Sequence, residues 1–569
     1  MMQDLTWAIC GEAGFGMNVA GFILAKIFSR EKYAVIATNE YPSLIRGSHN
    51  FVSLRVSTRE IFAPKQSIDI LVALNKETVD LHKKQLARDA IILFDPDNYE
   101  WEKEEIGTGV VLIPMKFSGA AMKNTIALGA TIALLGKDFS ILSGMLHEQF
   151  SKKGEGIIAE NIKVAEYGYQ FVKENYKKVD THVLSPGNRE KPQLVVNASE
   201  AVGLGAIAGG MKFAAIYPMT PINSLIPLFA DHAKDLGIVY KQPEDEIAGI
   251  NMAIGASLAG ARSMVATSGG GFALMVEGVS MAGIMEVPLV VDLGMRPGPA
   301  TGMPTWTEQG ELWMAIHAGH GEFARIVLAP GDAEDSFALT KKAFHLAEKY
   351  QIPVFVLTDK YLNESLWQMP QPAVSVENTK LAMTTAEQKD VTNNQPFLRY
   401  DTNTKDGVSL RSLPGMSQGE YVANSYEHGE DGYTTEDAGM RKRMVDKRMR
   451  KTEAIRQIAE APVVYGDSDA DIAFVCFGSV KGVIRQAIDD LKKDGKKAKL
   501  LFFGWVYPLP ESIGEILAKE KRVICVEQNA TGQLASVIRE QTGFEIKEKW
   551  LKYDGRQWTV KEILEKYGR

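Results

Sequence analysis

The chain has 569 residues, of which 45% are hydrophobic and 24% charged, and its formal net charge at pH 7 is −7. This length predicts about three to five domains, and the composition is ordinary for a soluble globular protein. The mild negative charge argues against a general nucleic-acid-binding protein, which carries a basic stripe. The first twenty residues lack the pattern of a secretory signal, and no apolar run reaches the ~18 residues that a membrane span needs. We therefore expect a cytoplasmic protein without a membrane span.

The three cysteines, Cys10, Cys476 and Cys525, lie far apart in the sequence, and none belongs to a Cys-x-x-Cys pair. A disulfide framework is not expected, which is consistent with a reducing cytosol. The chain alone also lacks the four cysteines that hold an iron–sulfur cluster. Because Cys476 and Cys525 stand within apolar stretches, they are predicted to be buried strand thiols.

Residues 1–180 are predicted to form a first α/β domain. Its expected elements are strands at 5–10, 35–38, 68–74, 90–94 and 110–113, with a helix at 17–29. Strands that are apolar almost throughout and alternate with helices indicate a parallel sheet with helices on both faces. A Ser-Pro-Gly-Asn stretch then marks a linker, which we place at 181–194.

The same alternation predicts two more α/β domains, at 195–375 and 466–569. The expected strands are 213–217, 263–267, 287–292, 324–328 and 354–358 in the first and 472–477, 498–503 and 522–527 in the second, where a helix is expected at 480–493. Polar and turn residues dominate 376–465, which is interpreted as an extended connector. We interpret its basic run at 440–451 as a solvated helix face rather than a nucleic-acid patch.

A glycine-rich loop, Gly11-Glu-Ala-Gly-Phe-Gly16, stands between the first expected strand and helix. This layout can place a phosphate on a helix N-terminus, so Gly11, Gly14 and Gly16 are candidate cofactor-binding residues. The spacing is G-x-x-G-x-G rather than the dinucleotide pattern G-x-G-x-x-G, and a tight turn with a packing role is the alternative. Arg46 and His49 follow on a loop, where they either face an anion such as coenzyme A or belong to a solvated loop.

The loop Tyr217-Pro-Met-Thr-Pro221 directly follows an expected strand. Its two prolines restrict the backbone and hold the Thr220 hydroxyl with little freedom. Residues at the carboxyl ends of parallel strands face the ligand crevice. Glu246 begins a helical pattern crowded with small residues, and its carboxylate either has a chemical role or simply favours the helix N-terminus.

Two more loops follow expected strands in the same domain. Gly269 and Gly270, in a three-glycine stretch, permit close approach of the backbone to a ligand. Arg296, in Met295-Arg-Pro-Gly-Pro-Ala-Thr-Gly-Met-Pro-Thr305, offers the planar fork that bonds both oxygens of a carboxylate. With Thr301 and Thr305 nearby in sequence, this loop predicts a pocket for a small anionic substrate.

The order of these motifs resembles the alpha subunit of the 2-oxoacid:ferredoxin oxidoreductases, with a gamma domain fused at its N-terminus. The resemblance covers nearly the whole chain and implies a thiamine-enzyme pyrimidine-type domain at 195–375 and a transketolase C-terminal-like domain at 466–569. It implies that Glu246 bonds the aminopyrimidine ring of thiamine diphosphate and that Thr220 contacts the substrate or the reacting end of the cofactor. It also assigns Arg296, Thr305, Thr301 and Tyr217 to the 2-oxoacid pocket.

The chain departs from the family pattern at three positions, where Met219, Met295 and Ala300 replace isoleucine, glutamine and serine. The last two changes leave the choice of 2-oxoacid open, although the fused organisation resembles 2-oxoglutarate enzymes. Two alternatives remain, a transketolase-type thiamine-dependent transferase or dehydrogenase, and a non-catalytic nucleotide- or coenzyme-A-binding scaffold.

The chain also lacks the Gly-Asp-Gly segment that holds a metal-bound diphosphate, since Gly331-Asp-Ala333 has alanine in place of the second glycine. The resemblance therefore implies a beta subunit that carries Mg²⁺ and a [4Fe–4S] cluster, in an alpha–beta or (alpha–beta)₂ assembly. Thiamine diphosphate would be shared between the subunits, coenzyme A would be a co-substrate, and ferredoxin would receive the electrons. No metal-ligating set is predicted on this chain, because His428, beside Glu427, Glu430 and Asp431, lacks a second histidine at ligand spacing.

Overall fold

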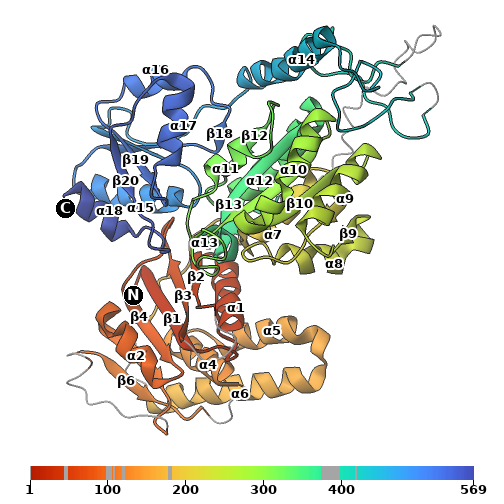
Figure 1. The fold of residues 1–569 in the computed structure, drawn as a ribbon. Coiled ribbons are helices and arrows are strands. Elements are labelled where there is room, and N and C mark those ends of the chain that lie inside the picture. The colour runs from red at the N-terminus through yellow and green to blue at the C-terminus, as the bar shows by residue number, and fades with distance from the viewer. Residues whose placement is uncertain are drawn as a thin grey trace. The chain divides into compact units, whose positions relative to one another are not determined.

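The computed structural model describes residues 2–43, 49–97, 106, 109–117, 122–176, 182–372, 397–416 and 419–568. The chain divides into two compact units, which we describe separately (Figure 1). Unit 1 comprises Met1–Asn197, Glu364–Pro372 and Thr559–Glu562, and unit 2 comprises the remainder. In both units, strands and helices alternate along the chain, as expected for the α/β class.

Unit 1 is built on an eight-stranded sheet in the order β6-β5-β4-β1-β3-β2-β14-β7. Its strands are β1 (Asp4–Glu12), β2 (Ala34–Glu40), β3 (His49–Ser57), β4 (Ile68–Ala73), β5 (Leu86–Phe94), β6 (Val111–Pro114), β7 (Leu194–Asn197) and β14 (Leu366–Met369). Its helices are α1 (Met17–Arg30), α2 (Lys76–His82), α4 (Lys123–Leu134), α5 (Phe139–Phe150) and α6 (Glu155–Asn175), with short 3₁₀ turns η1 (Lys83–Gln85) and η3 (Ser151–Lys153).

The sheet of unit 1 is mixed, whereas the sequence predicted parallel strands throughout. Strand β3 was not predicted, and it pairs antiparallel with both β1 and β2. The connection from β2 to β3 is too short for a crossover, which needs a dozen or more residues, so the two strands form an antiparallel pair. The remaining pairs from β1 through β6 are parallel as expected.

Alternate residues of β1 enter two separate hydrophobic clusters, one on each face of the sheet. Trp7 and Ile9 pack with α1 and α4, while Ala8 and Cys10 pack with Val79 of α2. This follows from the two-residue period of a strand. Figure 1 shows the same arrangement, with α2 on the opposite side of the sheet from α1 and α4.

Unit 2 contains a seven-stranded sheet in the order β18-β12-β13-β11-β10-β8-β9. All its pairs are parallel except β12 with β18. The strands are β8 (Phe213–Ala215), β9 (Val239–Lys241), β10 (Ser263–Ser268), β11 (Leu289–Met295), β12 (Ile326–Leu328), β13 (Pro353–Asp359) and β18 (Trp505–Tyr507). The associated helices are α7 (Ala198–Ala208), α8 (Leu225–Leu236), α9 (Glu246–Leu258), α10 (Gly269–Ile284), α11 (Leu312–His317), α12 (Ala333–Tyr350) and α13 (Lys360–Glu364).

Both faces of this sheet are covered by helices, as the apolar strands predicted. Val265 and Val291 belong to the cluster that contains residues of α9, α10 and α11. Their neighbours in sequence, Met264 and Val290, belong to the cluster that contains residues of α7 and α12. The carboxyl ends of the central strands therefore open at one edge between two helical layers.

The C-terminal part of unit 2 carries a five-stranded sheet in the order β15-β17-β16-β19-β20. Its elements are β15 (Val463–Gly466), β16 (Ile472–Cys476), β17 (Ala498–Phe502), β19 (Val523–Glu527), β20 (Glu548–Leu551), α15 (Val480–Lys493), α16 (Ile513–Ala518), α17 (Gln533–Thr542) and α18 (Val560–Tyr567), the last with residues in both units. Cys476 and Cys525 lie on β16 and β19 and are fully buried, which confirms their prediction as strand thiols. The five-part domain division stays a prediction. Strand β14, from within the predicted domain at 195–375, and β7, at the boundary between that domain and the predicted linker, pair in the sheet of unit 1.

The basic run in the connector is a solvated helix face only in its first part, where Arg441, Lys442 and Arg443 are exposed, and the prediction was wrong for the second part. It lies on α14 (Ala438–Arg456), where Lys447 and Lys451 are buried and both form ion pairs with Glu286 at 2.5–2.6 Å. Arg448 is also buried, and it pairs with Glu427. The basic residues spaced three and four apart share one side of the helix and face carboxylates that are distant in sequence.

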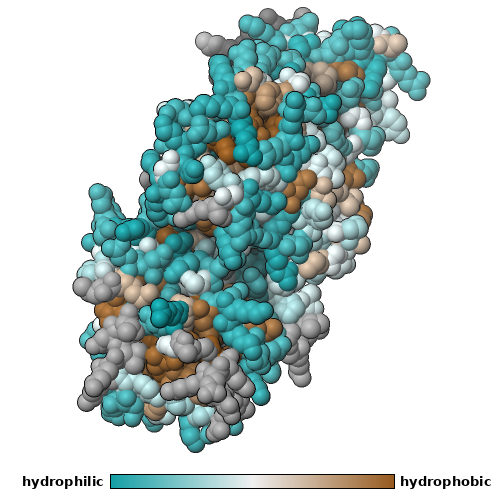
Figure 2. Space-filling view, turned by 90° about the vertical axis from the view of Figure 1, so that its left-hand side faces the viewer, coloured by the Kyte–Doolittle hydropathy of each residue, from teal (hydrophilic) through white to brown (hydrophobic). Residues whose placement is uncertain are grey.

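The surface is largely hydrophilic on the face drawn in Figure 2, with hydrophobic residues in separate patches. Such scattered apolar exposure is normal for a folded protein. Among the residues that the structure describes, no helix is both long and apolar enough to cross a membrane.

Candidate functional site

Three loops of unit 2 lie at the carboxyl ends of strands β8, β10 and β11, which are neighbours in the sheet. The loop Tyr217–Pro221 follows β8, the N-terminus of α10 follows β10, and the loop 296–305 follows β11. This edge is where ligands bind in open parallel α/β sheets. The structure thus brings to one edge the three loops that the sequence singled out.

The first and third loops are joined by a hydrogen bond. Arg296 Nη1 donates to the backbone carbonyl of Thr220 at 2.8 Å. Pro221 lies against Gly294 of β11, where an added Cβ would come within 3.0 Å of the proline ring. Thr220, Arg296 and Tyr217 are all half-buried. Part of the guanidinium therefore holds the two loops together, an arrangement that the sequence did not predict.

Glu246 is the first residue of α9 and is 3% exposed. The helix cap is supplied by its neighbour, because Asp245 Oδ1 accepts a hydrogen bond from the Ala248 amide at 2.8 Å. The sequence left open whether Glu246 merely favours the helix N-terminus, and the structure gives the capping bond to Asp245. The Glu246 carboxylate instead receives a long hydrogen bond, 3.5 Å, from Thr267 Oγ1.

Two of the three glycines at the N-terminus of α10 lie close to neighbouring side chains. An added Cβ at Gly271 would lie 2.2 Å from Glu246 Oε1 and 2.2 Å from Thr267 Oγ1. At Gly269 the added Cβ would lie 2.7 Å from Glu311 Oε1, whereas at Gly270 the nearest atom, the Ala300 carbonyl oxygen, is 4.0 Å away. Of these three glycines, Gly271, which was not among the predicted residues, therefore leaves the least room for a side chain.

Glu311 is a second carboxylate of this region that sequence reasoning missed. Burial, reinforced by the nearby charge of Glu308, raises the pKa of Glu311 to about 8, against the opposing charge of Arg296. Its Oε2 is buried and has no hydrogen-bond partner among the described residues. No motif marks Glu311 in the sequence, so only its packing against Gly269 and its electrostatic effect on Arg296 reveal it.

The loop after Arg296 presents its two threonines differently. Thr305 is 5% exposed, and its Oγ1 has no hydrogen-bond partner in the described part of the chain. Thr301 is exposed. Ala300 adopts a left-handed backbone with φ 55°, which is uncommon for a residue other than glycine. Thr305 is therefore a buried polar group that could bond a ligand, and Thr301 lies at the surface of the loop.

The glycine-rich loop of unit 1 is a separate feature. Gly14 and Gly16 have φ values of 96° and 70°, and Gly16 stands at the N-cap of α1. The Gly16 carbonyl accepts a hydrogen bond from Asn124 Nδ2 at 3.1 Å, and an added Cβ at Gly11 would meet Leu74 at 2.8 Å. The turn and its packing account for these glycines. Arg46 lies outside the described residues.

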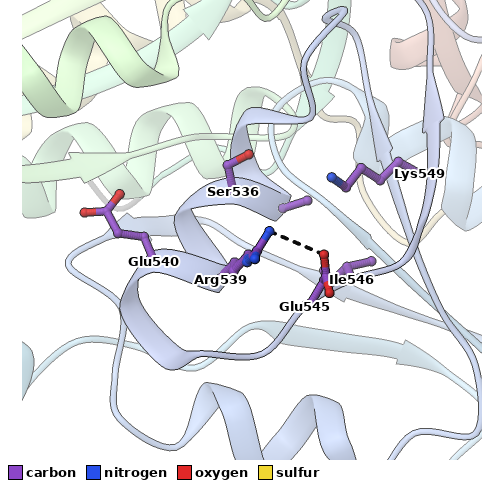
Figure 3. A pocket seen from close by; sticks show the side chains of 7 residues that line it. Ser536, Arg539, Glu540, Glu545, Ile546 and Lys549 are labelled. Atoms are coloured by element: carbon purple, nitrogen blue, oxygen red, sulfur yellow. Dashed lines mark ion pairs between the residues drawn. The ribbon is translucent and has the colours of Figure 1, made fainter.

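A pocket of about 370 Å³ lies elsewhere in unit 2, beside α17 and β20 (Figure 3). It is lined by Ala535, Ser536, Arg539, Glu540, Glu545, Ile546 and Lys549. Arg539 and Glu545 form an ion pair at 3.4 Å across it. None of the predicted site residues lines this pocket, and both of its central charged groups are exposed at the surface.

The polar groups around His428 are engaged with other protein groups. Glu427 pairs with Arg448, and Glu430 accepts hydrogen bonds from the amide and hydroxyl of Thr402. His428 itself is buried, with its ring 3.9 Å from that of Tyr400. These contacts explain the Glu-His-x-Glu-x-Gly segment as a packed turn.

The sequence of this chain is similar to those of known oxidoreductase subunits. Three consecutive parts of the chain match models of the pyruvate:ferredoxin/flavodoxin oxidoreductases. Residues 6–171 match the pyruvate ferredoxin/flavodoxin oxidoreductase model, 204–447 the thiamine-diphosphate-binding model, and 470–563 core domain II. The chain is thus an oxidoreductase subunit that contains a domain of the thiamine-diphosphate-binding type.

The chain belongs to the 2-oxoacid:ferredoxin oxidoreductase alpha-subunit family. It is 32% identical to subunit alpha of 2-oxoacid:ferredoxin oxidoreductase 2 of Aeropyrum pernix, over 99% of this chain and 98% of that one. It is 33% identical to the 2-oxoglutarate synthase subunit KorA of Methanocaldococcus jannaschii, over 59% of this chain and 88% of that one. A solved 2-oxoglutarate:ferredoxin oxidoreductase of Magnetococcus marinus, with 2-oxoglutarate, coenzyme A and succinyl-CoA bound, matches with a TM-score of 0.89 and 31% identity, over 100% of this chain and 99% of that one.

Proposed function

We propose that this chain is the subunit that binds the 2-oxoacid and activates thiamine diphosphate in a coenzyme-A-dependent oxidative decarboxylation. The proposed substrate is 2-oxoglutarate, and the proposed electron acceptor is ferredoxin. The substrate is supported by the similarity to KorA and to the Magnetococcus marinus enzyme, whose bound ligands are 2-oxoglutarate, coenzyme A and succinyl-CoA. The observation that carries the catalytic assignment is the buried Glu246 carboxylate, which is not used as a helix cap.

The residues around Glu246 fit one half of thiamine diphosphate. Thiamine diphosphate supplies a stabilised carbanion and an electron sink for decarboxylation of a 2-oxoacid. Its aminopyrimidine ring carries nitrogen atoms that need a carboxylic partner, and Glu246 offers one in a buried setting. Gly271 keeps the space beside that carboxylate clear of side-chain atoms, since any Cβ there would overlap Glu246 Oε1.

Glu246 would hold a proton at the ring nitrogen facing it. Removal of water from this position strengthens such a hydrogen bond, because the interaction is stronger at low local dielectric. Thr267 Oγ1, at 3.5 Å from Glu246 Oε1, orients the carboxylate from the strand side. Asp245 leaves the carboxylate available by satisfying the helix N-terminus.

The substrate carboxylate is assigned to Arg296 together with the hydroxyls of Thr220 and Thr305. Burial lowers the pKa of Arg296, but an arginine remains charged at neutral pH. The bond from Arg296 Nη1 to the Thr220 carbonyl fixes the guanidinium plane, so the fork is oriented before substrate binds. Thr301, at the exposed part of the loop, and the half-buried Tyr217 would line the entrance.

The chain contains no Gly-Asp-Gly segment for a diphosphate and only three cysteines, which are far apart in sequence. We therefore place the magnesium–diphosphate site and the iron–sulfur cluster on a beta subunit, and coenzyme A as a co-substrate of the assembled enzyme. The segment most similar to Gly-Asp-Gly is Gly331-Asp-Ala333, where Asp332 caps α12 and pairs with Lys481 at 2.6 Å. Its contacts support a structural role.

The assignment of Glu246 is tested by Glu246→Gln in the complete complex. Loss of the acid–base group should lower turnover by about 10²–10⁴-fold, while the complex still assembles. Glu244→Gln is the matched control, because Glu244 precedes the same helix but is exposed. Turnover of Glu246→Gln within a factor of about two of the parent enzyme would refute the catalytic role.

The choice of substrate is tested separately by comparing kcat/KM for 2-oxoglutarate, pyruvate and a branched-chain 2-oxoacid, with ferredoxin as acceptor. The proposal expects 2-oxoglutarate to be the best of the three. A preference for pyruvate would overturn the substrate while leaving the role of Glu246 intact.

A further inference from the structure

A cysteine and two histidines come together in unit 1, outside the site described above. One potential ligand atom from each of Cys10, His49 and His82 lies within 4.8 Å of the other two. Cys10 is near the end of β1, His49 begins β3, and His82 ends α2. These residues are well separated in sequence, so no sequence motif with metal-ligand spacing predicts the cluster.

The register of the sheet explains why the three side chains meet. Cys10 is directly opposite Phe51 on the neighbouring antiparallel strand, and His49 lies two residues before Phe51. Residues two apart on a strand share a face, so Cys10 and His49 project from the same side of the sheet. Helix α2 covers this side, with Val79 in the hydrophobic cluster of Cys10. The ring of His82 stacks on that of Phe51 at 4.6 Å.

The two imidazoles face one another through their ring nitrogens. His49 Nε2 and His82 Nε2 are 2.7 Å apart. His82 Nδ1 lies 2.7 Å from Gln85 Oε1, and because an amide oxygen only accepts, the proton of His82 stands on Nδ1. His82 Nε2 therefore carries a lone pair that points at His49. Either a proton on His49 or a cation must stand between the two nitrogens, since two lone pairs at this distance would repel.

The remaining ring nitrogens, Nδ1 of His49 and Nδ1 of His82, have different surroundings. His49 Nδ1 is buried and has no hydrogen-bond partner among the described residues. It is not the nitrogen that faces His82, so with a cation on Nε2 it would carry the ring proton. The bond from His82 Nδ1 to Gln85 is of the kind that fixes the tautomer and orientation of a metal-bound histidine.

We propose that Cys10, His49 and His82 bind a zinc ion in unit 1. The proposal does not depend on the function proposed above, because it uses no residue of unit 2. Two imidazoles and a thiolate form a donor set suited to zinc and unsuited to magnesium or calcium, which prefer oxygen ligands. Three protein ligands leave one tetrahedral position for water or another ligand.

Zinc binding would bring the three ligand atoms, which now lie within 4.8 Å of one another, to tetrahedral spacing. Zinc–nitrogen bonds of about 2.0–2.1 Å in a tetrahedral site place two ligand nitrogens roughly 3.3 Å apart, so the imidazoles would separate by about half an ångström. The buried Cys10 thiol would lose its proton to the solvent as the zinc–sulfur bond forms. Zinc does not change oxidation state, so no electron donor or acceptor is involved.

The experiment uses the purified full chain, stripped with a chelator and then loaded with Co²⁺ or Zn²⁺. We expect Co²⁺ to give visible d–d bands and a near-ultraviolet thiolate-to-cobalt charge-transfer band, and Zn²⁺ to remain after desalting at a single ion per chain. Zinc should also raise the melting temperature of the stripped chain, because it binds the folded state. Cys10→Ser should remove the charge-transfer band, and His82→Gln should weaken binding at least tenfold.

Two variants serve as controls. Cys525→Ser removes another buried thiol, and His147→Gln removes an exposed histidine of unit 1, so both should bind cobalt like the parent chain. Because Cys10 is fully buried, its variant is checked for unchanged circular dichroism, and the half-buried His82 gives an independent test if Cys10→Ser does not fold. The proposal is refuted if the parent chain binds no cobalt, or if cobalt binds with equal affinity and spectrum to the Cys10 and His82 variants. The 2.7 Å contact is then an ordinary N–H···N hydrogen bond.

Discussion

Two carboxylates of unit 2 differ in their partners, because Glu286 is paired with two lysines and Glu311 has an oxygen with no partner among the described residues. Glu286, at the end of α10, forms ion pairs with Lys447 and Lys451 of α14. Glu311 precedes α11 and packs against Gly269 at the beginning of α10, and its Oε2 is buried with no partner among the described residues. A buried carboxylate whose charge is balanced by nearby lysines stays ionised. A buried carboxyl without such partners can change its protonation state or bind a ligand.

The two carboxyls consequently shift in opposite directions. Burial alone would raise the pKa of Glu286, but the two lysines hold it well below its usual range. Burial raises the pKa of Glu311 to about 8. A depressed pKa contributes stability above the unfolded-state pKa that is lost in acid, and a raised pKa makes stability fall as the pH increases. The two ends of α10 should therefore respond to opposite extremes of pH.

The largest expected effect is a loss of stability when Glu286, the carboxylate paired with two lysines, is replaced. Glu286→Ala leaves Lys447 and Lys451 buried without a counter-charge, which should cost about 3–5 kcal/mol of the free energy of unfolding. Urea denaturation of the purified chain measures this loss. Asp446→Asn, which breaks the exposed pair with Lys442 on the same helix, is the control and should leave the midpoint nearly unchanged. Equal effects of the two substitutions would contradict the distinction between buried and exposed pairs.

The next effect is on activity, at the start of α10. Gly271→Ala places a methyl group where Glu246 Oε1 and Thr267 Oγ1 now lie, and turnover should fall about 100-fold, or roughly 2.7 kcal/mol of transition-state stabilisation. Gly270→Ala is the matched control, since its Cβ would be 4.0 Å from the nearest atom, the Ala300 carbonyl oxygen, and alanine improves helix propensity by about 1 kcal/mol. Steady-state kinetics and thermal unfolding of both variants separate the two effects. Normal turnover of Gly271→Ala would show that Glu246 tolerates displacement.

A smaller effect is expected at the proposed substrate anchor. Arg296→Ala should raise the KM for the 2-oxoacid about tenfold or more, since a charge-assisted hydrogen bond contributes ~1.5–3 kcal/mol. The change should appear in KM more than in kcat if the arginine binds the ground state and the transition state alike. Arg539→Ala, in the separate pocket of Figure 3, is the control and should leave KM unchanged. The reverse result would move the substrate to that pocket.

Much of this site could be predicted because it depends on local sequence. Each predicted loop follows an apolar strand, and the parallel sheet then gathers the strand ends at one edge. Glu246 was found because it stands at a helix start, and its neighbour Asp245 supplies the cap. The family resemblance added the chemistry that we propose for these positions.

The remainder could not be predicted because it depends on contacts between distant segments. Glu286 and Lys447 are 161 positions apart, and the basic run gave no sign of which carboxylate it would meet. Glu311 stands in an unremarkable polar stretch, and its significance arises only from packing against Gly269. Strand β3 was missed because the residues around His49 are polar, although the rest of the strand is buried between β1 and β2.

The smallest expected effect is a change in how the stability of the chain depends on pH when Glu311, beside the N-terminus of α10, is replaced. With a folded-state pKa of about 8 against an ordinary value of 4.5, Glu311 keeps a proton in the folded chain that the unfolded chain has already lost. Stability from this group therefore falls as the pH rises from about 4.5 to about 8 and is constant above that range. Glu311→Gln removes the titration, so the melting temperature of the variant minus that of the parent chain should increase between pH 5 and pH 9.

Glu277→Gln replaces an exposed carboxylate on the same helix and should give a constant offset over this range. A difference for Glu311→Gln that stays flat with pH would mean that Glu311 is already ionised at pH 5. Arg296 would then compensate Glu311 as fully as the lysines compensate Glu286, and the contrast between the two carboxylates would disappear. An increase would instead identify Glu311 as a neutral acid beside Gly269 at neutral pH, able to donate a hydrogen bond to a ligand at the N-terminus of α10.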